Sequence, residues 1–120
     1  MEIYIRDASV DAVEAWLRAS FDAVDRVRDD PAVQLQVTHD GAAQTAQITL
    51  NVQAGDWTSV WFESGPLPWD TVTACARSAF EAIDEEVLCY PDRYEDEPWK
   101  MLQLHPNTGE SFVDERDVNF

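Results

Sequence analysis

The sequence contains little glycine, histidine, cysteine or lysine, and these scarcities exclude several kinds of site. Its 120 residues include only four glycines and hold no glycine-rich loop of the kind that cradles phosphate groups. The two histidines and two cysteines show no metal-ligand spacing, and the Gly-x-Ser-x-Gly motif of a nucleophilic serine is absent. The carboxylates of residues 92–97 do not follow the spacing of a calcium-binding loop. We therefore expect no metal site, no cofactor and no dedicated catalytic set.

Long apolar runs and targeting features are missing as well. No stretch approaches the roughly 18 apolar residues of a membrane-spanning helix, so we expect no membrane span. Residues 1–7 have neither the basic nor the apolar part of a signal peptide, which predicts a cytoplasmic protein. In that compartment Cys75 and Cys89 are expected to be reduced thiols rather than a disulfide.

Negative charge is the most prominent property that the sequence does have. Asp and Glu number 24 against 8 Lys and Arg, for a net charge of −16, and residues 84–97 hold a run of carboxylates with a single Arg. Such a surface repels nucleic acid and anionic membranes and attracts cationic partners. Coding bias or adaptation to salt would also produce an acidic composition, so a merely solvated surface stays open as an alternative.

The apolar pattern predicts one folded domain, residues 1–120, that begins with a strand and a helix. An apolar content of 45% argues against disorder. Alternation predicts a strand over 2–6. The spacing of Val10, Val13, Leu17, Phe21 and Val24 then predicts an amphipathic helix that Asp30-Pro31 ends, with ion pairs Glu14–Arg18 and Asp22–Arg26 on its outer face.

The same two apolar patterns, strand alternation and helical spacing, predict the remaining elements. Residues 32–39 and 44–53 read as a hairpin around Asp40-Gly41, with one apolar face and one face of Gln, Thr and Asn. A third strand over 57–63 places Trp57 and Trp61 opposite Val60. A second helix is expected from an N-cap at Asp70 to about residue 87, followed by strands over 99–105 and 110–113.

These elements predict an α+β fold of order β-α-β-β-β-α-β-(β). We expect two helices packed on one face of a mostly antiparallel sheet of four to six strands. The sequence shows no repeat and no linker that would divide the chain.

Aromatic residues are interleaved with the acids near the C-terminal end, which is typical of a protein-binding surface. Tyr and Trp supply much of the binding energy in interfaces, and carboxylates around them would pair with a partner's Lys and Arg side chains. The alternative is that these aromatics belong to the core. The residues expected to contact a partner are Asp84, Glu85, Asp92, Tyr94, Glu95, Asp96 and Glu97, with Asp114, Glu115 and Asp117 as a second patch.

Three functions are compatible with this sequence. The first is an acidic inhibitor of a basic protein, most concretely an immunity protein against a nuclease-like or nucleotide-modifying bacterial toxin, which would act as a mimic of nucleic-acid phosphates. The second is an adaptor or assembly domain that docks through an exposed sheet edge or through the face bearing Trp57 and Trp61. The third is a small enzyme that uses carboxylates, or a carboxylate with His105. We expect a binding protein rather than an enzyme.

Overall fold

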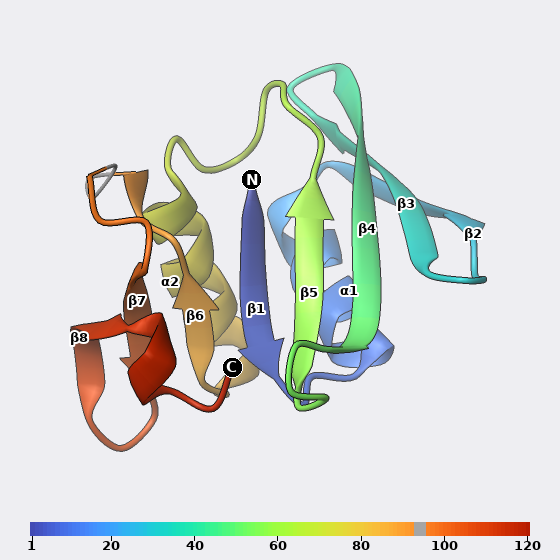
Figure 1. Cartoon of the computed structure of the whole chain (residues 1–120). Helices are drawn as coiled ribbons and strands as arrows, with labels where there is room; N and C mark the ends of the chain where they lie inside the picture. Colours follow the sequence, from blue (N-terminus) through green and yellow to red (C-terminus); the bar gives the residue numbers. More distant parts are fainter. Residues whose placement is uncertain (93–95) are drawn as a thin grey trace.

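The computed structural model describes residues 1–92 and 96–120 and shows an α+β fold (Figure 1). The described part contains eight strands, two α-helices and one short 3-10 helix. In chain order they are β1 (Glu2–Arg6), α1 (Val10–Ser20), β2 (Ala23–Arg28), β3 (Val33–His39), β4 (Ala42–Val52), β5 (Trp57–Phe62), α2 (Val72–Ile83), β6 (Val87–Cys89), β7 (Lys100–His105), β8 (Gly109–Asp114) and η2 (Glu115–Asp117).

The eight strands form one antiparallel sheet in the order β2-β3-β4-β5-β1-β6-β7-β8. β1 is central, because it pairs with β5 on one side and with β6 on the other. β2 and β8 form the two outer edges (Figure 1). Both helices lie behind the sheet in this view, so one face is covered by helices and the other is not.

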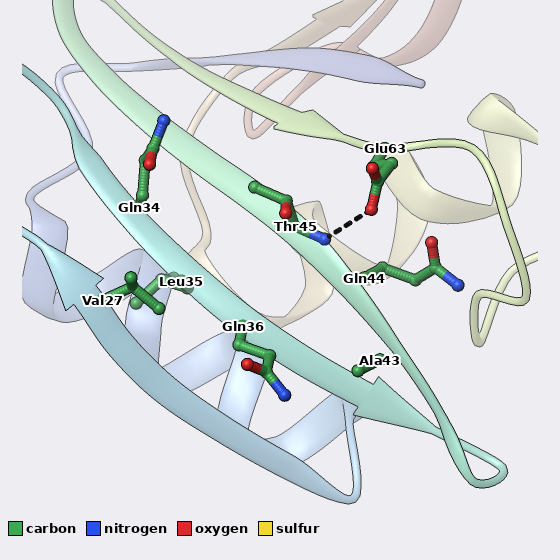
Figure 2. A pocket seen from close by; sticks show the side chains of 8 residues that line it. All are labelled: Val27, Gln34, Leu35, Gln36, Ala43, Gln44, Thr45 and Glu63. Carbon is green, nitrogen blue, oxygen red and sulfur yellow. Dashed lines mark hydrogen bonds between the residues drawn. The ribbon is translucent and has the colours of Figure 1, made fainter.

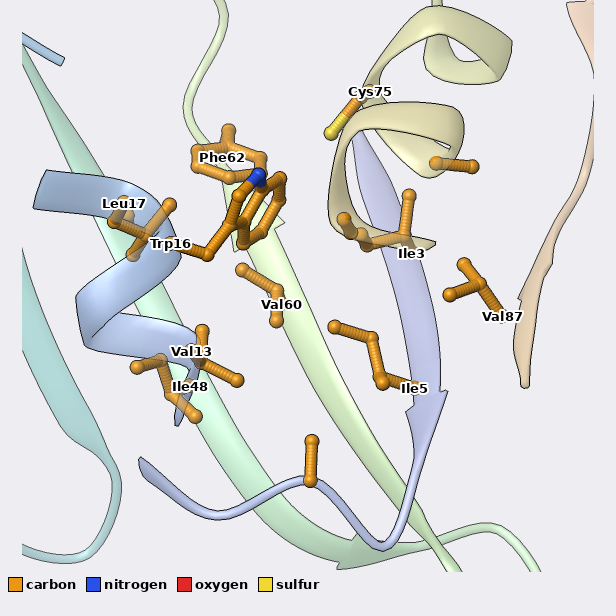
Figure 3. Packing of buried hydrophobic residues seen from close by; sticks show 14 of the residues in the cluster. Ile3, Ile5, Val13, Trp16, Leu17, Ile48, Val60, Phe62, Cys75 and Val87 are labelled. Atoms are coloured by element: carbon orange, nitrogen blue, oxygen red, sulfur yellow. The ribbon is translucent and has the colours of Figure 1, made fainter. Parts of the chain in front are cut away.

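The main core lies between the two helices and the sheet (Figure 3). Ile3 and Ile5 of β1 are fully buried there beside Val60 of β5. Trp16 of α1 contributes its ring, and its indole nitrogen donates to the hydroxyl of Ser78 on α2 at 3.0 Å. This bond and the apolar packing fix the two helices against each other and against the centre of the sheet.

A second, smaller core lies on the opposite face of the sheet. Tyr4, Trp57, Leu88 and Met101 are buried there, and the C-terminal segment packs over them through Val118 and Phe120. The Phe120 ring lies 4.7 Å from that of Tyr4 and 5.8 Å from that of Trp57, and the Trp57 indole donates to the Asn119 carbonyl at 2.8 Å. The C-terminal segment therefore covers only the part of this face around β1, β5, β6 and β7.

The first helix is shorter than predicted. α1 ends at Ser20, and residues 23–28 form the edge strand β2, which pairs with β3. The predicted pair Glu14–Arg18 is present at 3.5 Å, whereas Arg26 pairs with Glu14 and Asp29 instead of Asp22. Val24 is buried, as the helical pattern predicted. It lies on β2 instead of a helix, and β2 pairs with the backbone of β3 along one edge of that strand.

The second helix is also shorter than predicted, and it is followed by a strand. α2 is capped by Thr71 rather than Asp70 and stops at Ile83, with Asp84 in the left-handed region at φ 59°. Carboxylates at a helix C-terminus oppose the helix dipole, and residues 84–86 are all acidic. The next residues form β6. Together, β2 and β6 bring the sheet to eight strands rather than four to six, in the chain order β-α-β-β-β-β-α-β-β-β.

The predicted hairpin and third strand are confirmed. Asp40 and Gly41 connect β3 to β4 with φ angles of 52° and 82°, the positive values that a tight hairpin turn requires. Along β5, Val60 faces the helices and Trp57 faces the other way. Among the described residues no helix is long and apolar enough to cross a membrane.

Candidate partner-binding surface

The acidic segment 84–97 lies at two separate places rather than in one patch. Asp84 and Glu85 are exposed in the connection from α2 to β6, which precedes the N-terminal end of β6. Asp92, Asp96 and Glu97 follow the other end of β6. β6 therefore separates the first two carboxylates from the rest. Tyr94 and Glu95, which are also predicted to contact a partner, lie outside the described residues.

Backbone pairing brings the second predicted patch next to Asp96 and Glu97. Lys100 opens β7 opposite Asp114 of β8, and its backbone N–H donates to the Glu97 carbonyl at 2.9 Å. The Glu115 N–H donates to the Trp99 carbonyl at 2.8 Å. We call this region the acidic corner; it consists of Tyr90, Asp96, Glu97, Trp99, Asp114, Glu115 and Asp117.

Two aromatic side chains are exposed within the acidic corner. Trp99 is 43% exposed and Tyr90 is 38% exposed, although large aromatic side chains are usually buried. A pocket of about 370 Å³ lies here, lined by Trp99, Asp114, Glu115 and Arg116, and it is large enough to receive a side chain of a partner. An exposed indole beside carboxylates suits the aliphatic stem and charged head of an Arg or Lys side chain.

Some of the carboxylates in this corner are held in place by neighbouring groups. The Tyr90 hydroxyl donates to Glu115, and burial together with that carboxylate raises the pKa of Tyr90, so the phenol stays a donor at neutral pH. Asp114 accepts from the Arg116 backbone N–H at 3.1 Å and pairs with its guanidinium at 2.9 Å. Asp96 and Asp117 are exposed and form no ion pair with another described residue.

Glu86, which belongs to the same acidic run, has a structural position instead. Only 6% of it is exposed, and its carboxylate accepts from Arg6 Nε at 2.8 Å and Gln103 Nε2 at 2.6 Å. The Arg6 guanidinium in turn lies 4.5 Å from the centre of the Trp57 ring. This carboxylate therefore links β1 and β7 through Arg6 and Gln103, and its burial makes it unavailable to a partner.

The half of the sheet face that the C-terminal segment leaves open is polar (Figure 2). A pocket of about 320 Å³ lies over β2, β3 and β4, where Gln34, Gln36, Thr45 and Glu63 line it beside Val27. Trp61, on the neighbouring strand, is 41% exposed on this face, whereas Trp57 is buried. The sequence signal was the run of Gln and Thr opposite the apolar face of the hairpin, which marks an open face but does not specify a pocket.

Both thiols are buried, and both imidazoles lie next to hairpin turns. Burial raises the pKa of the Cys89 thiol to about 12 and that of the Cys75 thiol still further above its ordinary value, so both resist forming thiolates. His105 accepts from the Asn107 N–H at 3.1 Å in the β7–β8 turn, and His39 lies against Phe21. Within residues 1–92 and 96–120 no group of three or more His, Cys, Asp or Glu side chains could hold a metal ion.

Comparison with known proteins yields no match to a protein family, to a curated protein or to a solved structure. The acidic corner and the open polar face are the two candidate binding surfaces described above.

Proposed function

We propose that this chain is an acidic binding protein that covers the basic working surface of a protein partner. The most concrete form of the proposal is an immunity protein against a nuclease-like or nucleotide-modifying bacterial toxin. The single observation that carries it is the acidic corner, where two exposed aromatic side chains stand among carboxylates beside a pocket.

The physical argument rests on complementarity. A protein that handles nucleic acid or nucleotides lines its site with Lys and Arg, and carboxylates at matching positions can replace the phosphate groups. Trp99 and Tyr90 would supply the desolvated contacts that dominate binding energy, while the surrounding carboxylates would pair at the rim. The overall charge of −16 would raise the association rate by about 10- to 1,000-fold through electrostatic steering.

A second candidate is an adaptor or assembly domain, and the open polar face favours it. Trp61 is exposed on this face, which also carries the pocket lined largely by amide and hydroxyl side chains. Such a face suits a neutral protein surface better than a basic one. Binding through this face would depend little on salt, because few charges take part. That difference separates the two candidates.

Capture of partners from the lysate of the host, at about 50 mM and about 500 mM salt, tests the proposal. Wild-type protein is compared with a variant that carries Asp96→Lys, Glu97→Lys and Asp117→Lys in the acidic corner. The matched control changes three exposed carboxylates elsewhere, as Asp11→Lys, Asp25→Lys and Asp30→Lys.

We expect the wild type and the control to retain one basic protein in stoichiometric amount at low salt, and the corner variant to lose it. The captured protein should also lose its activity on nucleic acid or nucleotides when the wild type is added. Equal capture by all three proteins at both salts would contradict the proposal and favour the adaptor function through the Trp61 face.

A further inference from the structure

The open polar face combines a pocket with an exposed tryptophan. The pocket over β2, β3 and β4 measures about 320 Å³, and small-molecule sites measure roughly 300–1,000 Å³ (Figure 2). Strand register places Trp61 beside it. The ladder between β4 and β5 continues to Glu63, a lining residue whose N–H donates to the Thr45 carbonyl at 2.9 Å. Glu63 comes two residues after Trp61, so the two side chains share this face.

Several side chains of this region have binding capacity that the chain itself leaves unused. Trp61 is 41% exposed, and among the described residues its indole has neither a hydrogen bond nor a ring contact. Gln36 is exposed, and its amide has no partner within the described part of the chain. One carboxylate oxygen of Glu63 accepts the Thr45 backbone N–H at 3.1 Å, which leaves the second oxygen for a ligand (Figure 2).

The charges around the pocket disfavour an anion and favour a ligand with a single positive charge. Glu63 is the one charged side chain among the described residues that line it. On the β2 rim, Asp25 lies opposite Gln36 and Arg28 lies opposite Gln34, so these two charges offset each other. One carboxylate matches one ammonium group rather than a cluster of Lys and Arg side chains.

The other side chains favour a ligand that is rich in hydroxyl groups. A Gln amide and a Thr hydroxyl each donate and accept hydrogen bonds, and a sugar hydroxyl does the same. The exposed indole of Trp61 offers an apolar face for the C–H groups of a sugar ring, and its π electrons attract a nearby cation. A second copy of this chain does not suit the face, because two molecules of charge −16 repel each other.

We propose that the open polar face binds a short oligosaccharide of amino sugars. One sugar ring occupies the pocket, where its ammonium group pairs with Glu63 and its hydroxyls exchange hydrogen bonds with Gln36. The next ring packs against Trp61. The inference goes beyond the proposed function, because it assigns a ligand to a surface other than the acidic corner.

The test titrates the full chain with a short glucosamine oligomer and with its N-acetylated counterpart, at a mildly acidic pH where free amines and carboxylates are charged. The two probes share their sugar rings and ring hydroxyls, but only the first carries ammonium groups. NMR signals of backbone amides and indole N–H groups locate the bound probe. We expect the glucosamine oligomer to shift the signals of Trp61 and of β3 to β5, and to bind about fivefold more tightly than the N-acetylated oligomer.

Two pairs of variants provide the controls, and all four positions are exposed. Trp61→Ala should weaken binding of the glucosamine oligomer by at least about fivefold. Trp99→Ala removes a tryptophan of similar exposure, 43% against 41%, from the acidic corner and should leave that binding unchanged. Glu63→Gln should remove the preference for the charged oligomer, whereas Glu85→Gln should retain it.

Equal binding of the two oligomers, signal changes confined to the acidic corner, or no binding at millimolar oligomer would each overturn the inference. A lysate protein that Trp61→Ala fails to capture, and that neither oligomer displaces, would also overturn it and assign this face to the adaptor function. The failure is separable from that of the proposed function. If the corner variant loses its basic partner while the wild type binds neither oligomer, the proposed function stands and the sugar site falls.

Discussion

Replacing Glu86 with alanine should destabilise the protein more than replacing any exposed carboxylate. The Glu86 carboxylate is buried and accepts from Arg6 at 2.8 Å and from Gln103 at 2.6 Å. Removing one partner of a buried ion pair costs about 3–5 kcal/mol, because the other charge is left unpaired. The Arg6 side chain is 31% exposed and retains Asp56 at 3.9 Å, so we expect the lower end of that range, about 3 kcal/mol.

Thermal and urea unfolding measure this loss. For a chain of this length about 3 kcal/mol corresponds to a fall in Tm of about 12 °C. Glu85→Ala is the matched control, since it removes the same charge from an exposed neighbour and should change stability by no more than about 0.5 kcal/mol. The double variant Arg6→Ala/Glu86→Ala should cost less than the sum of the single changes, because neither charge is then left alone. A loss below about 1 kcal/mol for Glu86→Ala, or strict additivity, would refute this account of the buried pair.

The buried thiols, a buried phenol and the C-terminal segment give three further predictions. Because burial raises the pKa values of Cys75 and Cys89, a thiol reagent at about pH 8 should modify neither in the folded protein and both in urea; rapid reaction of the folded protein would show an accessible thiol. Burial and Glu2 raise the pKa of Tyr4 from 10.0 to about 12, so the folded state keeps a proton that the unfolded chain releases. The free energy of unfolding should therefore fall as pH rises from about 10 to about 12, and Tyr4→Phe should flatten that fall in urea titrations, whereas identical slopes would contradict the assignment. Phe120→Ala removes the ring that covers Trp57 and Tyr4 and should cost about 2 kcal/mol in thermal unfolding, while an unchanged Tm would show that the segment contributes no packing energy.

The sequence predicts the elements whose periodicity has only one interpretation. Alternation over 33–39 and 57–62, with a turn at Asp40-Gly41, gives strands with the correct faces. Prediction from periodicity fails where a helical pattern and a strand pattern fit the same residues. Phe21 and Val24 continue the apolar stripe of α1, yet Phe21 is already extended at ψ 158° and Val24 lies on β2. Pairing with the edge of β3 favours a strand over a helix for residues 23–28. The local sequence pattern does not show that this edge is available.

The acidic corner could be predicted in part, and for a similar reason. Charge and aromatic content locate the two segments, 84–97 and 114–117, that supply its residues. The acidic residues of 84–97 are divided between two places by β6, a strand of three residues. In the sequence β6 resembles the end of a helix, because Val87 follows the apolar spacing of α2. Only the pairing of β6 with β1 and β7 shows that Asp84 and Glu85 lie apart from Asp96 and Glu97. Long-range strand order, which the sequence does not encode locally, thus decides which acids share a surface.

The most direct test of the central claim is the rate of association with the captured basic partner, measured by stopped flow at about 50 mM and about 500 mM salt. The account predicts that high salt slows association of the wild type by at least about tenfold. The variant with Asp96→Lys, Glu97→Lys and Asp117→Lys should associate slowly at both salts, and the control with Asp11→Lys, Asp25→Lys and Asp30→Lys should resemble the wild type. An association rate that is independent of salt, or that falls equally in both variants, would contradict the claim that the acidic corner binds the partner.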